Sequence, residues 1–393
     1  MKILVVSGFS MYPAYSGETR RYASYAFHEM LKHYKKHNDV EIRVICLRLR
    51  YPKIFNYFKR VRVFNTKNNG FSESYIDDVL VYNLPIFKFP KLPVLSSYIR
   101  KKSDYLRKVL LNVDYKPDII ISITTGFSKR ISENLKEYFS CPVILSVHNC
   151  DVFSMKRNTN FDKIDFFSFR SPKIKKNFFE KVSKKPLKFT VDTFGIDESL
   201  IIKERENTNK KKLKMIAVGS LIPLKNFDIL IQAVAKSLEY VEELNIYGEG
   251  FQREKLKKII DKNKLNEVVK LLGEKPKVEV LENLRISDVF ALVSSPETLG
   301  LAYLEALAKG CIVIGTKDEG IDGVIIDGVN GFLCKPKDVE MLHKVIKKIF
   351  FLTESGKSNI TKNALSTAKR NTNQFFLKKY ITNCFELIEK GPQ

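Results

Sequence analysis

The sequence predicts an α/β protein built from two Rossmann-like, doubly wound parallel-sheet domains. Short apolar runs alternate with longer amphipathic segments along almost the whole chain, which is typical of parallel sheets covered by helices on both faces. This alternation occurs twice, on either side of a polar segment at residues 204–212. The length of 393 residues also suits two domains of ordinary size.

The first half of the chain is expected to contribute one sheet. Runs rich in Val, Ile and Leu predict buried strands at residues 2–7, 41–47, 79–84, 118–123, 142–147 and 187–191. Apolar or aromatic residues at helical spacing predict helices at residues 18–37, 97–111, 128–138 and 173–185. Residues 48–75 are basic, aromatic and irregular, which favours loops with a short strand.

The second half repeats the pattern. Strands are expected at residues 213–218, 244–247, 268–272, 289–293 and 311–315. Helices are expected at residues 226–239, 253–262, 277–284, 301–309, 337–352 and 363–389, the last one broken near Asn371. Ligands of such sheets bind beyond the carboxyl ends of the strands, so the loops after the strands are the expected position of a site.

The charge is strongly basic, with a formal net charge of +24. Residues 1–200 hold 36 basic and 19 acidic residues, and residues 201–393 hold 32 and 25, so most of the excess lies in the first half. A basic surface favours anionic partners such as a membrane surface, a phosphorylated substrate or nucleic acid. A lysine-rich solvated surface explains the same excess without any partner.

Several chemistries lack their sequence signatures. The chain has no Walker A sequence, no HExxH, no zinc-type Cys/His pairing and no DxD, so neither a metal nor a cofactor is expected. No stretch is long and apolar enough for a transmembrane helix or a signal peptide. The six cysteines are scattered and suit small core residues in a reducing compartment, which favours a cytoplasmic protein.

The most informative segment is SSPETLGLAYLEALAKG, residues 294–310, which follows an apolar run. Glu297 is expected in the loop and Glu305 on the second turn of a helix that begins near Gly300. Between them, the backbone N–H groups of Leu299, Gly300 and Leu301 form a helix N-terminus suited to an anion. Two carboxylates beside an anion site suit a nucleotide sugar. An ordinary helix with one surface and one entry carboxylate remains an equal alternative.

These residues resemble glycosyltransferase family 4, which is retaining, has the GT-B fold and carries a Glu-x7-Glu motif. The run ALAKGCIVI after Glu305 fits this family, as do AVGSLIPLKN at residues 217–226, IYGEG at 246–250, FGID at 194–197 and the segment 320–333. The resemblance implies two Rossmann-like domains facing a central cleft. Residues 1–197 would bind the acceptor and residues 198–370 the donor, and a helix at residues 371–393 would cross back to the first domain.

The resemblance also implies roles for individual residues of the second half. Lys225 and Gly219 match the part that grips the donor diphosphate, whereas Ser220 stands where the family has an arginine. Glu297 matches the catalytic carboxylate beside the donor sugar, and Glu305 matches the ribose binder. Leu299, Gly300 and Leu301 complete the expected donor-binding set. Candidate contacts to the base follow the second and third strands, at Gly248, Gly250, Gly273 and Glu274.

In the first half, Gly17 is a partial match to a glycine pair near the diphosphate, and Arg20 is a candidate acceptor contact. His148 follows a predicted strand, where the family has a histidine close to the donor sugar, so it is the second candidate catalytic residue. Asp151 is expected either to orient this histidine or to touch the acceptor. Basic aromatic segments at residues 51–64, 97–111 and 172–189 could dock on anionic lipid, although solvated helix faces are an equal alternative.

Together these features predict a metal-independent glycosyltransferase that moves a hexosyl or N-acetylhexosaminyl group. The donor would be a UDP- or GDP-sugar, and the acceptor a saccharide or lipid-linked saccharide of a bacterial surface polysaccharide. The protein would lie in the cytoplasm, at the inner face of the membrane, without binding nucleic acid. Two alternatives stay open: a polyanion- or nucleic-acid-binding protein, and a GT-B protein that binds or hydrolyses a nucleotide sugar without transfer.

Overall fold

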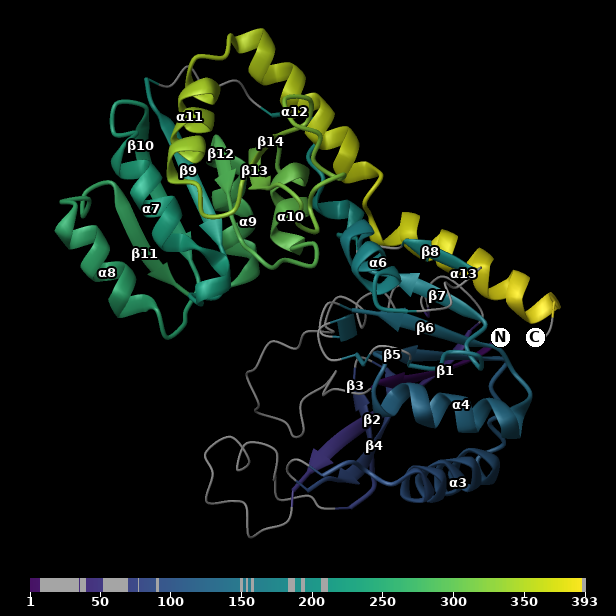
Figure 1. Ribbon diagram of the computed structural model, residues 1–393. Helices are drawn as coiled ribbons and strands as arrows, with labels where there is room; N and C mark the ends of the chain where they lie inside the picture. The colour runs from purple at the N-terminus through teal and green to yellow at the C-terminus, as the bar shows by residue number, and fades with distance from the viewer. Residues whose placement is uncertain are drawn as a thin grey trace. The chain divides into compact units, whose positions relative to one another are not determined.

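The computed structural model describes residues 1–7, 35, 40–51, 70–76, 78–89, 92–148, 151–152, 155–156, 159–182, 188–191, 195–205 and 211–390. The chain divides into two compact units (Figure 1). The first unit comprises Met1–Arg170, Ile174–Phe194 and Phe376–Gln393, and the second comprises Ser171–Lys173 and Gly195–Phe375. Each unit is built around a sheet of its own, as the alternation of strands and helices predicts.

The sheet of the first unit has the order β3-β4-β2-β1-β5-β6-β7-β8 in the described part of the chain. All neighbouring strands are parallel except β3 and β4. The strands are β1 Lys2–Ser7, β2 Glu41–Arg50, β3 Ser72–Ile76, β4 Val79–Phe87, β5 Ile119–Ile123, β6 Val143–Val147, β7 Phe166–Phe169 and β8 Phe189–Val191. The central strands β5 and β6 are buried along their whole length, because both faces of the sheet are covered.

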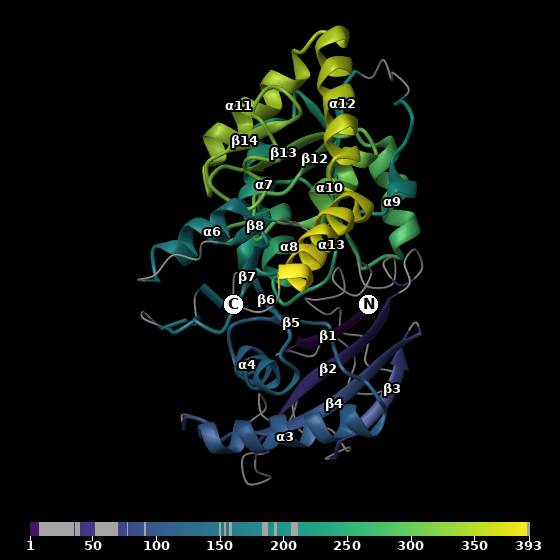
Figure 2. The same cartoon turned by 90° about the vertical axis from the view of Figure 1, so that its right-hand side faces the viewer.

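Helices α3 Ser96–Asn112, α4 Phe127–Phe139 and α6 Pro172–Phe179 pack on one face of this sheet. Figure 2 shows α3 and α4 alongside each other next to the strands. The buried residues of α3 are Ile99, Ser103, Leu106 and Leu110, which recur every three or four positions and so form one apolar stripe. On the opposite face, Tyr380 of α13 Asn373–Lys390 joins a second core cluster.

Strands β2, β4 and β7 of this sheet differ from the sequence prediction, and β4 runs to Phe87 instead of ending at residue 84. Strand β2 continues to Arg50 instead of ending at residue 47, because Arg48 and Arg50 are buried rather than solvated. The Arg48 guanidinium donates to Oδ1 of Asn83 on the neighbouring strand at 2.8 Å. Strand β7 was not expected, because its four residues, FFSF, are too short to show a period.

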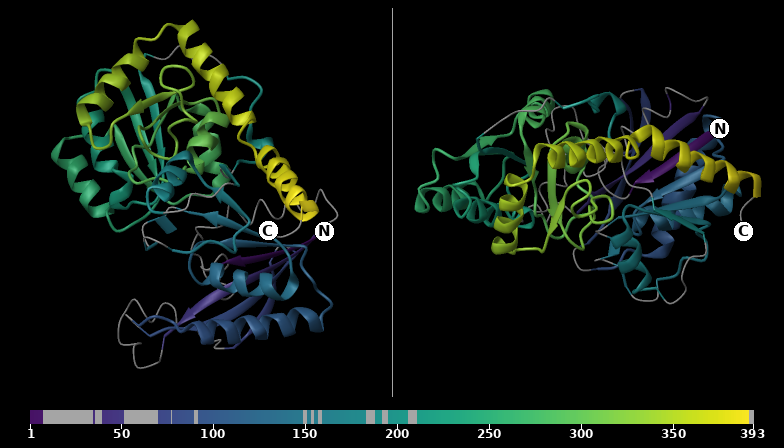
Figure 3. Two further views of the ribbon diagram at one scale, coloured as in Figure 1. Left: turned by 45° about the vertical axis from the view of Figure 1, so that its right-hand side comes forward. Right: turned by 90° about the horizontal axis from the view of Figure 1, so that it is seen from above.

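The sheet of the second unit is parallel and has the order β11-β10-β9-β12-β13-β14. Its strands are β9 Leu213–Val218, β10 Val241–Tyr247, β11 Val269–Gly273, β12 Val289–Ala291, β13 Ile312–Thr316 and β14 Phe332–Cys334. Its helices are α7 Phe227–Ala235, α8 Arg253–Lys262, α9 Lys277–Ile286, α10 Leu301–Ala308, α11 Val339–Phe350 and α12 Glu354–Lys369. Helix α7 contacts α8 and α11, whereas α10 contacts α9 and α12, so helices cover both faces (Figure 3).

The chain enters the second unit at Gly195 and leaves it after Phe375, and these two passages are hydrogen-bonded to each other. The Ile196 N–H donates to the Asn371 carbonyl at 3.0 Å, and the Asn373 N–H donates to the Ile196 carbonyl at 2.8 Å. A Cβ atom at Gly195 would lie 2.2 Å from the carbonyl carbon of Thr372, so only glycine permits this approach. The expected helix break near Asn371 is confirmed, but the preceding helix begins at Glu354 rather than near residue 363.

Candidate functional site

The loops at the carboxyl edge of the second sheet form the candidate site. Because all its strands are parallel, the segments that follow β9, β12 and β13 meet at the same edge. The Ser295 N–H donates to the Leu224 carbonyl at 2.8 Å, and the Asn226 side-chain amide donates to the Val293 carbonyl at 2.8 Å. These bonds fix the loop after β9 against the loop after β12, although about 70 residues separate them in the sequence.

Lys225 and Glu297 meet in this pair of loops. The Lys225 Nζ atom lies 2.5 Å from Oε2 of Glu297, which also accepts a hydrogen bond from the Ser294 hydroxyl at 2.9 Å. The other carboxylate oxygen accepts the N–H of Thr298 at 3.0 Å. The Lys225 side chain is 21% exposed and that of Glu297 is 12% exposed, so the ion pair is half-buried at the edge of the sheet.

Glu319 supports this loop and was not anticipated from the sequence. It follows β13, is 5% exposed, and accepts the N–H of Glu297 and the hydroxyl of Ser295, both at 2.8 Å. Glu319 Oε2 also forms an ion pair of 2.6 Å with Nζ of Lys173. A buried carboxylate held in this way orients the segment that carries Glu297. Its position in the sequence, in a run of turn residues, gives no sign of this role because Glu297 and Ser295 lie 22 and 24 positions earlier.

Helix α10 begins next to Glu297, as the sequence predicts. Gly300 is its N-cap and has φ of 78°, and a Cβ atom there would lie 2.7 Å from the Tyr303 ring. No side chain of the N-cap residue caps the helix, so the first N–H groups, from Leu301 onward, follow a glycine turn. Such a helix N-terminus suits an anion. Leu299 is 5% exposed and belongs to the buried core of the second unit, so its side chain is not open to a ligand.

Glu305 lies on the second turn of α10, with its side chain 15% exposed. Its Oε1 atom forms an ion pair of 3.0 Å with Nζ of Lys277, the first residue of α9. Glu305 thus lies on the helix that Gly300 caps. Lys277 is a neighbouring cation that the sequence pattern did not indicate. A partly buried carboxylate in this position can accept hydrogen bonds from neighbouring hydroxyl groups.

The glycines after β9 and β10 let two loops touch through their backbones. A Cβ atom at Gly248 would lie 1.9 Å from the Gly219 carbonyl oxygen, and one at Gly250 would lie 2.4 Å from the Leu221 carbonyl oxygen. The Gly248 N–H donates to the carbonyl of Gly273, which itself has a φ of 75°. Close packing alone thus requires glycine at 248 and 250, independently of any contact to a base. Ser220 and Glu274 are exposed beside these turns.

His148 and Asp151 lie at the carboxyl end of β6 in the first unit. The Asp151 carboxylate is buried and accepts the N–H of Thr125 at 2.6 Å, the Thr125 hydroxyl at 2.9 Å and the N–H of His148 at 2.7 Å. Burial raises the pKa of Asp151 to about 6, against the effect of these hydrogen bonds. This geometry favours the expected role of orienting His148 over a contact to the acceptor.

The His148 ring contacts Ser146, and Ser146 in turn contacts Arg170; neither residue was anticipated from the sequence. The Nε2 atom of the ring lies 3.1 Å from the Ser146 hydroxyl, which also contacts the Arg170 guanidinium. Burial, together with the Arg170 charge, lowers the pKa of His148 to about 3. The imidazole is therefore neutral at physiological pH. The remaining predicted residues of the first half, Gly17 and Arg20, lie outside the described part of the chain.

The neutral histidine makes the stability of the first unit depend on pH. The folded chain leaves His148 uncharged, whereas the unfolded chain takes up a proton below its ordinary pKa of about 6.5, so stability falls as the pH drops below that value. At about pH 5 the loss from this residue should be about 1–2 kcal/mol. We expect His148→Gln to lose that part of the pH dependence in denaturant unfolding. Asp151 titrates in both proteins and cancels in the difference; identical pH profiles would contradict the assignment.

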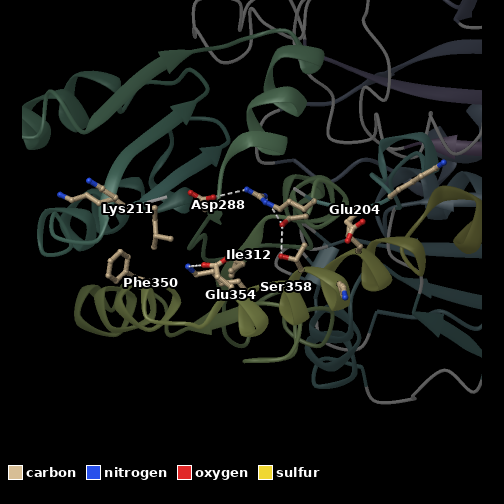
Figure 4. Close-up of a pocket in the computed structure, with 16 residues that line it drawn as sticks. Glu204, Lys211, Asp288, Ile312, Phe350, Glu354 and Ser358 are labelled. Atoms are coloured by element: carbon tan, nitrogen blue, oxygen red, sulfur yellow. Dashed lines mark hydrogen bonds and ion pairs between the residues drawn. The ribbon is translucent and has the colours of Figure 1, made fainter. Parts of the chain in front are cut away.

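A separate pocket of about 900 Å³ opens at the other edge of the second sheet (Figure 4). Leu213 and Ile312, which begin β9 and β13, and Asp288, which precedes β12, line it, so it lies at the amino ends of the strands. The Arg205 guanidinium crosses this region and donates to the carbonyl oxygens of Gly310 at 3.1 Å and Ser287 at 2.5 Å. None of the predicted site residues lines this pocket.

The described part of the chain contains neither a cluster of metal ligands nor a membrane-spanning helix. No group of three or more His, Cys, Asp or Glu side chains in these ranges is arranged to hold a metal ion. None of the helices described has the length and apolar character needed to cross a membrane. Four of the six cysteines, Cys46, Cys141, Cys311 and Cys334, are buried thiols, as expected for small core residues.

Residues 199–366 match the model of the family described as glycosyl transferases group 1. The GtfA subunit of a UDP-N-acetylglucosamine–peptide N-acetylglucosaminyltransferase from Streptococcus agalactiae is 27% identical over 268 residues, which cover 63% of this chain and 51% of the relative. A putative colanic acid biosynthesis glycosyltransferase, WcaL, from Salmonella typhimurium is 25% identical over 211 residues, 52% of each chain. The chain thus spans about half the length of these curated relatives.

Solved structures of other proteins align over almost the whole chain. A glycosyltransferase from Rickettsia africae aligns with a TM-score of 0.70 at 17% identity, over 99% of this chain and 98% of the other. The Anabaena protein HepE in complex with UDP aligns with a TM-score of 0.70 at 18% identity, over 98% of this chain and all of the other. The predicted fold class is therefore confirmed, because the chain has the GT-B fold. The match to the glycosyl transferases group 1 model is confined to residues 199–366, which lie in the second unit.

Proposed function

We propose that this protein is a glycosyltransferase that moves a hexosyl or N-acetylhexosaminyl group from a nucleotide sugar to a saccharide or lipid-linked saccharide. One observation carries the proposal: a lysine, two carboxylates and a bare helix N-terminus converge at the carboxyl edge of a parallel sheet. That edge is where ligands of doubly wound sheets bind. This combination matches the chemical parts of a nucleotide sugar one by one.

The diphosphate has two candidate partners in this arrangement. Lys225 supplies a cation, and the N–H groups at the start of α10 supply donors and a favourable dipole. In the described state Glu297 neutralises Lys225, so a bound diphosphate would compete with this carboxylate for the lysine. Ser220 offers no charge where the resembling family has an arginine, which places more of the phosphate binding on Lys225.

The nucleoside and sugar would flank the diphosphate. Glu305 suits the ribose, since an ionised carboxylate can accept hydrogen bonds from both hydroxyls. Glu297 would then face the sugar. The donor we propose is a UDP- or GDP-sugar; UDP is favoured by the name of the Streptococcus relative and by the UDP complex of the Anabaena structure.

Transfer would require groups that stabilise the departing diphosphate and groups that hold the sugar in place. Lys225 and the amino end of α10 would stabilise the departing diphosphate without a metal ion. His148, as a neutral side chain, would donate to or accept from a hydroxyl. The resemblance to family 4 supports retention of configuration, and no candidate residue is placed as a covalent nucleophile, so we propose a same-face substitution.

Thermal unfolding with nucleotides tests the donor site. We expect UDP or GDP, and its sugars, to raise Tm by about 5 °C at a hundredfold excess over Kd, because a ligand that binds only the folded state stabilises it. Glu305→Ala should weaken this binding by about 10–100-fold through the lost hydrogen bonds to a charged group. Glu282→Ala, an exposed carboxylate on α9 paired with Arg285, is the control and should bind normally. A shift only with polyanions would reject the donor site.

The acceptor side carries a surface suited to an anionic membrane. Exposed apolar residues gather between β4 and α3: Phe89 is 52% exposed, Leu92 59% and Leu95 70%. The second turn of α3 adds Arg100 and Lys101, both exposed. Apolar side chains can enter the headgroup region, and each cation near an anionic surface contributes about 1 kcal/mol. We therefore propose peripheral binding at the inner face of the cell membrane, consistent with an acceptor of a surface polysaccharide.

Vesicle flotation tests this membrane surface. The full chain should bind vesicles that contain phosphatidylglycerol and not neutral phosphatidylcholine vesicles, and salt should weaken the binding. The double substitution Leu92→Glu and Leu95→Glu should reduce binding by about tenfold or more. Phe251→Glu, an exposed aromatic residue of the second unit at 78% exposure, is the control. Equal binding by both variants would rule out this surface.

A further inference from the structure

The Ser146 hydroxyl connects a buried arginine to the candidate catalytic histidine. Ser146 lies near the end of β6 and is fully buried, and Arg170, directly after β7, is 1% exposed. The Arg170 guanidinium donates to the Ser146 Oγ atom twice, from Nε at 2.9 Å and from Nη2 at 2.8 Å. The same oxygen lies 3.1 Å from Nε2 of His148. Three nitrogen atoms therefore surround one hydroxyl oxygen.

The number of protons on this hydroxyl decides the direction of each bond. A serine hydroxyl has two lone pairs and one proton. A guanidinium can only donate, so the two N–H groups of Arg170 occupy both lone pairs. The Ser146 proton then remains for His148 Nε2, which must accept it and so carries no proton of its own. A neutral imidazole with a bare Nε2 carries its proton on Nδ1.

We propose that Arg170 is a positioning residue that, through the Ser146 hydroxyl, holds His148 as the neutral tautomer with its proton on Nδ1. The histidine then presents Nδ1–H as a hydrogen-bond donor and is not a cationic acid. A role of this donor toward a substrate hydroxyl rests on the proposed function. The tautomer itself does not, because it follows from the contacts of the protein alone.

The surroundings of His148 support one fixed state. Among the described residues, Arg170 and Asp151 are the charged groups closest to it in these contacts. The Arg170 charge opposes an imidazolium, while the Asp151 carboxylate is engaged with the N–H groups of Thr125 and His148. The backbone of His148 is thus held from one side and its ring from the other. Breaking this network would leave the buried Arg170 charge with fewer hydrogen-bond acceptors in a low-dielectric region. The network is therefore coupled to folding.

Nitrogen-15 NMR of histidine-labelled full-length protein tests the tautomer without any substrate. The five histidines give five ring signals, and His148→Gln identifies the one of interest. We expect an unprotonated Nε2 and a protonated Nδ1 throughout about pH 5 to pH 8, where an ordinary histidine titrates. A protonated Nε2, or an exchange average of both tautomers, would overturn the proposal.

Four variants separate this role from simple packing. In Ser146→Ala the proton should no longer be confined to Nδ1, so the ring signals should become an average of both tautomers. Ser146→Thr, which keeps a hydroxyl, should restore the tautomer with its proton on Nδ1. Arg170→Met should let His148 titrate closer to its ordinary pKa of about 6.5, and Arg170→Lys should retain part of the effect. Ser122→Ala removes another buried serine hydroxyl, on neighbouring β5, and should leave the signal unchanged. If Arg170→Met fails to fold, the serine pair still decides the matter, since an unchanged His148 signal in Ser146→Ala contradicts the proposal.

Activity measurements then test the consequence separately. If the tautomer is confirmed and Ser146→Ala lowers kcat of transfer more than it raises KM, with Ser146→Thr rescuing it, Nδ1–H acts in the reaction. If the tautomer is confirmed but no nucleotide binds, the proposed function fails while the positioning role stands. The two failures are therefore distinguishable.

Discussion

Replacing Lys225 with methionine is expected to lower kcat of sugar transfer by about 10²–10³-fold, the usual effect of removing one group that stabilises charge at a reacting centre. The variant also leaves the Glu297 carboxylate without its partner at 2.5 Å, beside the position proposed for the diphosphate. Repulsion between two anions should then weaken nucleoside diphosphate binding as well. Steady-state kinetics and calorimetric titration with UDP or GDP measure the two effects.

A double substitution distinguishes the two contributions. Lys225→Met with Glu297→Gln removes both charges, so nucleotide binding should recover in part while transfer remains lost. Lys255→Met is a matched control, because Lys255 forms a similar ion pair with Asp228 at 2.9 Å on the outer helices of the same unit. Normal transfer by Lys225→Met, or equal loss in the control, would contradict the proposed role of Lys225.

Gly248→Ala is expected to cause a large loss of stability in the second unit. Its Cβ atom would lie 1.9 Å from the Gly219 carbonyl oxygen, and its φ of 144° is one that residues with side chains rarely adopt. Because the contact is with backbone, the loops after β9 and β10 would have to separate. We expect a loss of more than about 4 kcal/mol and a fall in Tm of about 10 °C.

Gly219→Ala provides the control on the facing loop. A Cβ atom there would lie 3.6 Å from the Lys225 Cε atom and 3.6 Å from the Phe227 ring, which are ordinary contacts. Tm should therefore change little, while the added methyl group next to the Lys225 stem should weaken nucleotide binding. Calorimetry and titration of both variants check this contrast. Equal stability of the two variants would show that the loops do not pack as closely as described.

The sequence by itself determined the fold class and most elements of both sheets. Backbone periodicity is local, so buried strands such as Val143–Val147 and amphipathic helices such as Ser96–Asn112 follow from runs of a few residues. The segment from Glu297 to Glu305 also indicated a loop followed by a helix N-terminus, since glycine and the spacing of the two carboxylates are visible in the sequence. Short or charged strands, such as Phe166–Phe169 and the end of β2, were not determined in this way.

Only the tertiary structure decided which side chains meet. Lys225 and Glu297 are 72 positions apart, and Ser146 and Arg170 are 24 apart, so no local pattern connects them. The parallel register of each sheet brings the carboxyl ends of distant strands to one edge, and there the loops exchange hydrogen bonds. The same register places Gly248 against the backbone of Gly219 and brings Glu319 to the loop of Ser295 and Glu297. Local backbone geometry can be read along the chain, whereas these contacts arise from strand order, because neighbours in a parallel sheet are separated by whole crossover connections.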